Sequence, residues 1–83
     1  MTFNIITKYN IGDTVYSASE YYDVYPERSP YVVTNILINS SNEHVYINYE
    51  IEQNGFTHRM PEGWLFPTFE ECAEWCKEKN KEG

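Results

Sequence analysis

Apolar and polar side chains alternate most regularly over residues 44–52 of this 83-residue chain. The odd-numbered positions are apolar and the even-numbered positions are mostly polar, which is the period-two pattern of a β-strand with one buried face. The pattern predicts a strand whose core-facing side chains are Val45, Ile47, Tyr49 and Ile51.

Two further strands are predicted on either side of this segment. Residues 31–39 are rich in β-branched side chains and are apolar on both faces, so we expect a strand that is covered on both sides. Asn54-Gly55 is a strong signal for a tight hairpin turn into a strand at residues 56–60. With a polar loop at residues 40–43, these segments predict an antiparallel meander. The first of these strands has Val32, Thr34, Ile36 and Ile38 on one face and Tyr31, Val33 and Leu37 on the other.

The end of the chain has the pattern of an amphipathic helix. Thr68 and Glu71 have the spacing of a capping box, and acidic side chains precede lysines in the order that the helix dipole favours. Apolar residues recur at i, i+3, i+4 and i+7, which places them on one helix face. These signals predict a helix over residues 69–80 with an apolar stripe of Phe69, Cys72, Ala73 and Cys76.

Weaker signals complete the predicted fold. Gly12-Asp13 marks a turn into a strand at residues 14–18, and a long aromatic and acidic loop is expected at residues 19–30. A short last strand is predicted at residues 64–66. The fold class is therefore mainly β with one C-terminal helix, either an SH3-like small five-stranded antiparallel barrel or a strongly bent open sheet, with the helix packed on it. The chain is expected to be one domain, with a possible edge strand in residues 1–10 (at 2–6), the barrel in 11–66, the helix in 67–80 and a tail in 81–83.

The charge of the chain bears on its partners. The formal net charge is −7, and residues 1–76 hold three basic against eleven acidic side chains. Nucleic-acid affinity depends on neutralising phosphates with Lys and Arg, so direct DNA or RNA binding is not expected. The charge favours a basic protein surface as partner, although acidity for solubility alone explains the same composition.

Other function classes find little support in the residues. His44 and His58 fall on different predicted strands without a nucleophile motif, so an enzyme is not expected. Cys72 and Cys76 coincide with the helix stripe and are expected to be buried free thiols rather than zinc ligands. No metal or other cofactor is expected. Because no apolar window approaches the length of a membrane span and residues 1–9 lack the pattern of a signal peptide, a cytoplasmic location is the expectation.

The opening residues 11–16 and the closing residues 65–73 carry a loose resemblance to known proteins. They resemble a group of small bacterial and phage proteins with an SH3-like barrel, which open on Gly-Asp-x-Val-Tyr and end on a Phe-x-Thr-x-Glu-Glu-Ala pattern that starts a helix. The matching motifs are a turn and a helix cap, so the resemblance implies a fold and no functional residues. This chain departs from the pattern by having Pro67-Thr68 before its helix and a tyrosine-rich loop.

One cluster of aromatic and acidic residues could form a binding site. Tyrosine gives a large contact area at low entropic cost, and an aromatic ring beside a carboxylate suits a Lys or Arg side chain. We therefore expect a non-enzymatic module that docks on a basic partner surface. Given the resemblance to phage proteins, one version is an inhibitor that mimics phosphates in the nucleic-acid groove of a host defence enzyme such as a CRISPR effector. The alternatives are an aromatic-cage reader of a small or modified-lysine ligand and a self-associating structural subunit. The candidate residues are Tyr16, Glu20, Tyr21, Tyr22, Asp23, Tyr25, Glu27 and Tyr31.

Overall fold

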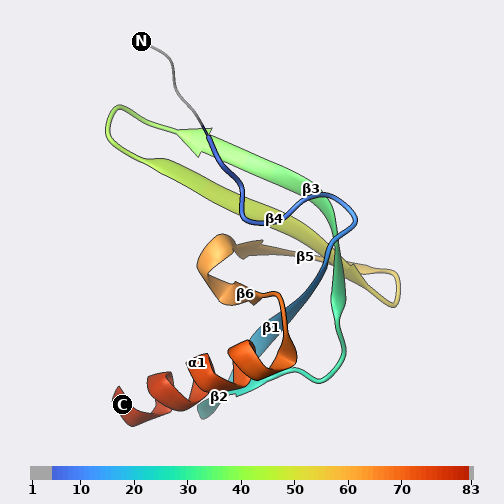
Figure 1. Ribbon diagram of the computed structural model, residues 1–83, viewed down its shortest axis with the longest axis vertical. Coiled ribbons are helices and arrows are strands. Elements are labelled where there is room, and N and C mark those ends of the chain that lie inside the picture. Colours follow the sequence, from blue (N-terminus) through green and yellow to red (C-terminus); the bar gives the residue numbers. More distant parts are fainter. Residues whose placement is uncertain (1–4, 83) are drawn as a thin grey trace.

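The predicted meander is present in the computed structural model, which describes residues 5–82 (Figure 1). Strands β3 (Tyr31–Ser40) and β4 (Val45–Gln53) pair along most of their length as a long antiparallel hairpin. Strand β5 (Phe56–Pro61) follows a two-residue turn in which Asn54 and Gly55 have φ angles of 52° and 83°. Positive φ at both positions defines the tight hairpin turn that Asn-Gly favours.

A β-bulge in β3 decides which of its two apolar faces lies in the core. The pairing of β3 with β4 shifts between Val33 and Asn35, so one extra residue is inserted on β3. Tyr31 and Val33 are buried before the bulge, and Ile36 packs on the same core after it. Strict alternation, which groups Ile36 with Val32, is therefore wrong across this point, and Val32 is exposed.

The segment expected to be a long loop is a second hairpin. Strand β1 (Thr14–Tyr21) extends past its predicted end, turns at Tyr22, and pairs with β2 (Asp23–Pro26). The start of β1 pairs with β3, and its middle pairs with the short strand β6 (Leu65–Phe66). The prediction of a long loop at residues 19–30 is therefore wrong for residues 19–26.

The sheet is strongly bent and is not closed. A single turn of 3-10 helix, η1 (Glu62–Trp64), links β5 to β6, and no backbone ladder joins these two strands within residues 5–82. The six strands form one antiparallel sheet, with β2 and β5 at the ends of the main strand order. The expected fold class is confirmed in its open form, with one strand more than the five predicted.

Helix α1 (Phe69–Glu82) packs beside β1 and β2, at the end of the molecule opposite the long hairpin (Figure 1). The hydroxyl oxygen of Thr68 accepts a hydrogen bond from the backbone N–H of Glu71 at 3.2 Å, as the capping box predicts. The helix runs two residues beyond its predicted end. Cys72 and Cys76 are buried against Ala18, which confirms the predicted stripe and the free thiols.

The core has two parts. The cluster under α1 also packs on Val24, Trp64 and Trp75. The larger cluster lies within the sheet and consists of Tyr9, Val15, Tyr31, Val33, Tyr49, Ile51 and Leu65.

Tyr9, which lies outside every predicted strand, belongs to the larger core. Its phenolic hydroxyl donates to the Leu65 carbonyl at 2.7 Å, and its backbone N–H donates to the Tyr49 hydroxyl at 3.2 Å. The Tyr49 hydroxyl donates in turn to the Glu62 carboxylate. Buried phenols need such partners, so this network ties the segment before β1 to β4, η1 and β6.

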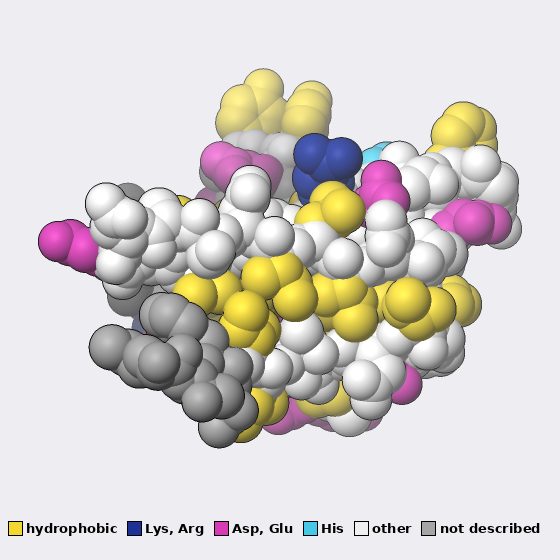
Figure 2. All heavy atoms as spheres, turned by 90° about the horizontal axis from the view of Figure 1, so that it is seen from above, with side chains coloured by type: hydrophobic (Ala, Val, Ile, Leu, Met, Phe, Trp, Pro, Cys, Tyr) yellow, Lys and Arg dark blue, Asp and Glu magenta, His cyan; other side chains and the backbone are white. Residues whose placement is uncertain are grey.

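The side chains of β4 that were predicted to face the core are not buried along the whole strand. Tyr49 and Ile51 are buried, whereas Val45 on β4 and Ile38 on β3 are exposed near the tip of the β3–β4 hairpin. Figure 2 shows apolar side chains gathered in a row on the face seen from this end. The possible edge strand at residues 2–6 falls mostly outside the described residues, and Ile5 and Ile6 are not in a strand.

Candidate functional site

The β1–β2 hairpin has two chemically different faces. Its register pairs Glu20 with Val24 and Ser19 with Tyr25. Because successive side chains of a strand point to opposite faces, the side chains divide into two sets. Ala18 and Val24 pack in the cluster under α1. The opposite face, turned away from the helix, carries Ser19, Tyr21, Asp23 and Tyr25.

Two tyrosines stand exposed at the tip of this hairpin. Tyr21 is 71% exposed and Tyr22 is 95% exposed. Their rings contact edge to face, with centroids 4.7 Å apart. Tyr22 has a φ of 65°, a left-handed conformation that is uncommon for a residue other than glycine. The tight turn therefore presents two large aromatic side chains to solvent.

One helix side chain, Asn80, forms hydrogen bonds with the backbone of the hairpin. The Asn80 carbonyl oxygen accepts a hydrogen bond from the Val24 backbone N–H at 3.0 Å, and its amide nitrogen donates to the Val24 carbonyl at 2.9 Å. These bonds satisfy two backbone groups on the free edge of β2, where another strand could otherwise pair. The hairpin is thus held in place while its outer face stays open.

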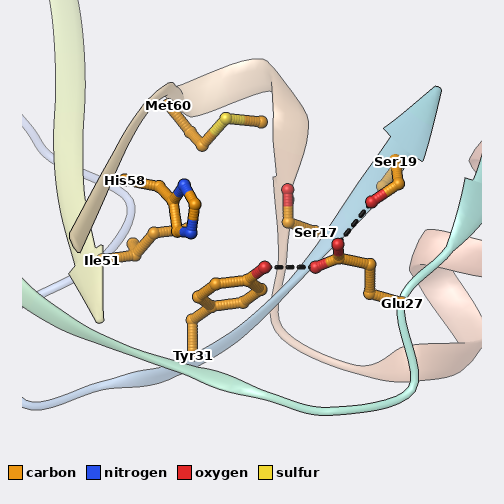
Figure 3. A pocket seen from close by; sticks show the side chains of 8 residues that line it. Ser17, Ser19, Glu27, Tyr31, Ile51, His58 and Met60 are labelled. Atoms are coloured by element: carbon orange, nitrogen blue, oxygen red, sulfur yellow. Dashed lines mark hydrogen bonds between the residues drawn. The ribbon is translucent and has the colours of Figure 1, made fainter. Parts of the chain in front are cut away.

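A pocket lies at the base of the outer face (Figure 3). The Glu27 carboxylate accepts hydrogen bonds from the hydroxyls of Ser19 and Tyr31, one on each oxygen. The backbone N–H of Glu27 donates to the Ser17 carbonyl at 3.0 Å, which continues the hairpin pairing. The His58 ring stands edge to face with Tyr31 at 5.8 Å. The pocket has a volume of about 190 Å³ and is lined by Ser17, Ala18, Ser19, Glu27, Tyr31, Ile51, His58 and Met60.

The charge around the hairpin is acidic on the side away from the helix. Residues 9–27 contain no Lys or Arg. Among residues 5–82, no basic side chain lies within ion-pair distance of Glu27, Asp23 or Glu20. The contact of Asn80 with Val24 brings the lysine-bearing end of α1 to the other face of the hairpin. The outer face is therefore the one suited to a cationic partner.

Three buried tyrosines, Tyr9, Tyr31 and Tyr49, have altered acidity. Burial, and then the hydrogen bond to Glu27, raises the pKa of Tyr31 from 10 to about 12. Burial, with a smaller effect of the Glu71 charge, raises the pKa of Tyr9 to about 12. Burial and the hydrogen bond to Glu62 also raise the pKa of Tyr49. In each case the fold favours the neutral phenol.

These raised pKa values predict a loss of stability in alkali. A phenol whose pKa is higher in the folded state than in the unfolded chain stabilises the fold fully below pH 10 and progressively less as the pH rises toward 12. Tyrosinate absorbance should therefore show three phenols that ionise at higher pH in the native protein than in the urea-unfolded protein. Tyr31→Phe should remove one of them. Superimposable titration curves for the native and the urea-unfolded protein would contradict the prediction.

The structure brings together six of the eight residues expected to form a site. Tyr21, Tyr22, Asp23 and Tyr25 lie on the tip or the outer face of the hairpin, and Glu27 and Tyr31 lie in the pocket at its base. Tyr16 packs edge to face on Phe69 at 6.3 Å, on the helix side. Glu20 is exposed but shares the face of Val24, so the eight do not form one surface.

Sequence reasoning missed Ser19 and His58 as members of this site. The sequence places Ser19 in a loop, so its pairing with Tyr25 across the hairpin was not predicted. His58 reaches Tyr31 only because β5 folds back along β4, opposite Ile51. The hairpin signal Asn54-Gly55 fixes that register, but it does not indicate that β3 brings Tyr31 to the same place.

The cysteines are not placed for reactivity. Burial raises the pKa of the Cys72 thiol to about 12 and also raises the pKa of Cys76. Nucleophilic attack and metal binding both need the thiolate, which burial disfavours here. Among residues 5–82, no group of three or more His, Cys, Asp or Glu side chains is arranged to hold a metal ion.

No protein-family model, curated protein or solved structure matches the chain. Within the described part of the chain, no helix combines the length and the apolar character needed to cross a bilayer.

Proposed function

We propose that this protein is a non-enzymatic binding module that docks the outer face of its β1–β2 hairpin on a basic surface of a partner protein. The observation that carries the proposal is the exposed pair Tyr21 and Tyr22 on a hairpin anchored by Asn80. Tyrosines are enriched at the energetic centres of interfaces, and an anchored hairpin loses little conformational freedom when it binds.

Charge supports a basic partner. Asp23 lies on the same face as Tyr21 and Tyr25, and no basic side chain pairs with it among residues 5–82. A partner lysine or arginine could stack on a tyrosine ring and pair with this carboxylate. Complementary charge also accelerates association, and this effect weakens as salt shortens the screening length. A nucleic-acid enzyme whose basic groove is occupied by the hairpin is one such partner.

The alternative of an aromatic cage has less support. A cage for a methylated ammonium needs several rings that converge on one pocket. Tyr31 lines the pocket of Figure 3, Tyr25 lines its neighbour, and Tyr46 lines a third, so the tyrosines are divided among the described pockets. The hairpin surface is therefore the better candidate.

Affinity capture with matched variants tests the proposal. Tagged wild-type protein, the triple variant Tyr21→Ala, Tyr22→Ala, Asp23→Asn, and the control Tyr46→Ala are each incubated with a bacterial lysate at low and moderate salt. Tyr46 is an exposed tyrosine on β4, outside the β1–β2 hairpin. We expect basic proteins that bind the wild type and the control, are lost with the triple variant, and dissociate as salt rises.

The opposite pattern of captured proteins would contradict the proposal. If the triple variant retains its fold by circular dichroism and captures the same proteins as the wild type, the hairpin is not the binding surface. If the captured proteins resist salt or are acidic, the charge argument fails.

A further inference from the structure

The Glu27 carboxylate has unused capacity to accept hydrogen bonds. Ser19 donates to one oxygen and Tyr31 donates to the other. A carboxylate oxygen has two lone-pair positions, so one position on each oxygen is left. Glu27 is partly buried, and no Lys or Arg among residues 5–82 neutralises it. A partly buried charge without a counter-ion favours the binding of a cation.

The walls of the pocket suit a planar cation with an apolar stem. Ile51 and Met60 line one side, and the Tyr31 and His58 rings meet edge to face between them and Glu27 (Figure 3). The volume of about 190 Å³ is several times the roughly 30 Å³ that a water molecule occupies in the liquid. A flat group can therefore enter beside the rings and reach the carboxylate.

We propose that this pocket binds the guanidinium group of an arginine side chain, with two of its N–H groups donating to the two oxygens of Glu27. The inference rests on the proposed function in that the basic partner supplies the arginine. Guanidinium has paired donors in the fork geometry that a carboxylate accepts, and it stacks on aromatic faces. An ammonium group is a more strongly hydrated point donor, so lysine should bind less well.

The pocket and the exposed tyrosines form one continuous face. Ser19 pairs directly with Tyr25, and Tyr21 lies two residues further along the same face of β1. An arginine held by Glu27 would lie at the base of the face that carries these tyrosines. The pocket thereby gives the docking surface a specific anchor in addition to its general negative charge.

A titration with small probes tests the pocket without the partner. The full-length protein is observed by two-dimensional amide NMR during addition of N-acetyl-arginine methylamide, the corresponding lysine compound, or the uncharged citrulline compound. With the arginine probe we expect saturable shifts for amides around Glu27, Tyr31 and His58. The lysine probe should bind more weakly than the arginine probe, and the affinity of the citrulline probe should be lower by a factor of roughly ten or more.

Matched variants separate the charge of Glu27 from its role in the fold. Glu27→Gln should lower the affinity for the arginine probe roughly tenfold, because it removes the charge while keeping a similar shape. Glu20→Gln removes a carboxylate from the opposite face of the hairpin and should leave binding unchanged. Ser19→Ala removes a structural hydrogen bond to Glu27 but not the charge, so the arginine probe should still bind.

The outcomes distinguish this inference from the proposed function. Four outcomes would each overturn the proposal that the pocket binds arginine. These are equal binding of the arginine and citrulline probes, unchanged binding of the arginine probe to the Glu27→Gln variant, shifts of amides away from the pocket, and no shift up to the solubility limit. If the hairpin variant still loses its captured proteins, the docking surface stands without the pocket. If the arginine probe binds at Glu27 but capture does not depend on the hairpin, the pocket stands and the docking surface fails.

Discussion

Replacing Tyr49 with alanine is expected to lower the free energy of unfolding by roughly 4–8 kcal/mol. Its side chain is fully buried, and removing a buried aromatic ring costs roughly 3–5 kcal/mol. The substitution also leaves the Tyr9 backbone N–H and the Glu62 carboxylate without their shared partner, for about 1–3 kcal/mol more. Small domains have a total unfolding free energy of about 5–15 kcal/mol, so the loss consumes much of the stability.

Two variants show whether the ring and the hydroxyl act as described. Tyr49→Phe keeps the edge-to-face contact with Tyr9 and removes only the hydroxyl, so it should cost about 1–3 kcal/mol. Tyr46→Ala lies on the same strand but is 56% exposed, and it should cost far less than Tyr49→Ala. Urea unfolding followed by circular dichroism measures all three. Equal losses for Tyr46→Ala and Tyr49→Ala would show that the core face of β4 is assigned wrongly.

The part of the fold that sequence predicts best is the part where local pattern and tertiary packing agree. Alternation along β4 correctly identified Tyr49 and Ile51 as core residues, and Asn54-Gly55 correctly identified the turn into β5. Along β3 the pattern was ambiguous because both faces are apolar. A bulge resolves this ambiguity by moving Ile36 to the face of Val33. No residue type at this place predicts the bulge.

The hairpin that carries the candidate site could not be located from local signals. Its turn is made by Tyr22 with a positive φ, at a position where Gly, Asn or Asp is the usual residue. The composition of the segment did identify the tyrosines and carboxylates as candidate binding residues. Only the register shows that Tyr21 and Tyr25 share the outer face, whereas Tyr16 and Glu20 lie on the opposite face, on the side of the helix.

The proposed docking face depends on α1 because the helix holds the hairpin through Asn80 and through the cluster around Trp75. The Trp75 ring lies 4.9 Å from Trp64 and 5.4 Å from Phe66, between centroids. Trp75→Ala should cost roughly 2 kcal/mol, less than a fully buried ring, because Trp75 is only partly buried. We expect this loss to appear first as local opening of the helix, since the larger core does not include it.

The buried thiols make this opening measurable. Cys72 and Cys76 lie under α1 at 0% and 3% exposure, so a thiol reagent reaches them only when the helix separates from the sheet or the whole protein unfolds. A loss of about 2 kcal/mol in the opening free energy corresponds to a roughly 30-fold faster reaction of the thiols. Glu74→Ala, at an exposed helix position beside Trp75, should leave the rate unchanged.

Comparison with amide exchange separates local from global opening in the same variant. If α1 separates as a unit, Trp75→Ala should accelerate exchange of the helix amides and of the Val24 amide, which Asn80 protects, while the amides of β3 and β4 near Tyr49 keep their protection. Uniform acceleration across both regions would mean that the two parts of the core unfold together. In that case the helix would stabilise the β1–β2 hairpin only through the stability of the whole fold.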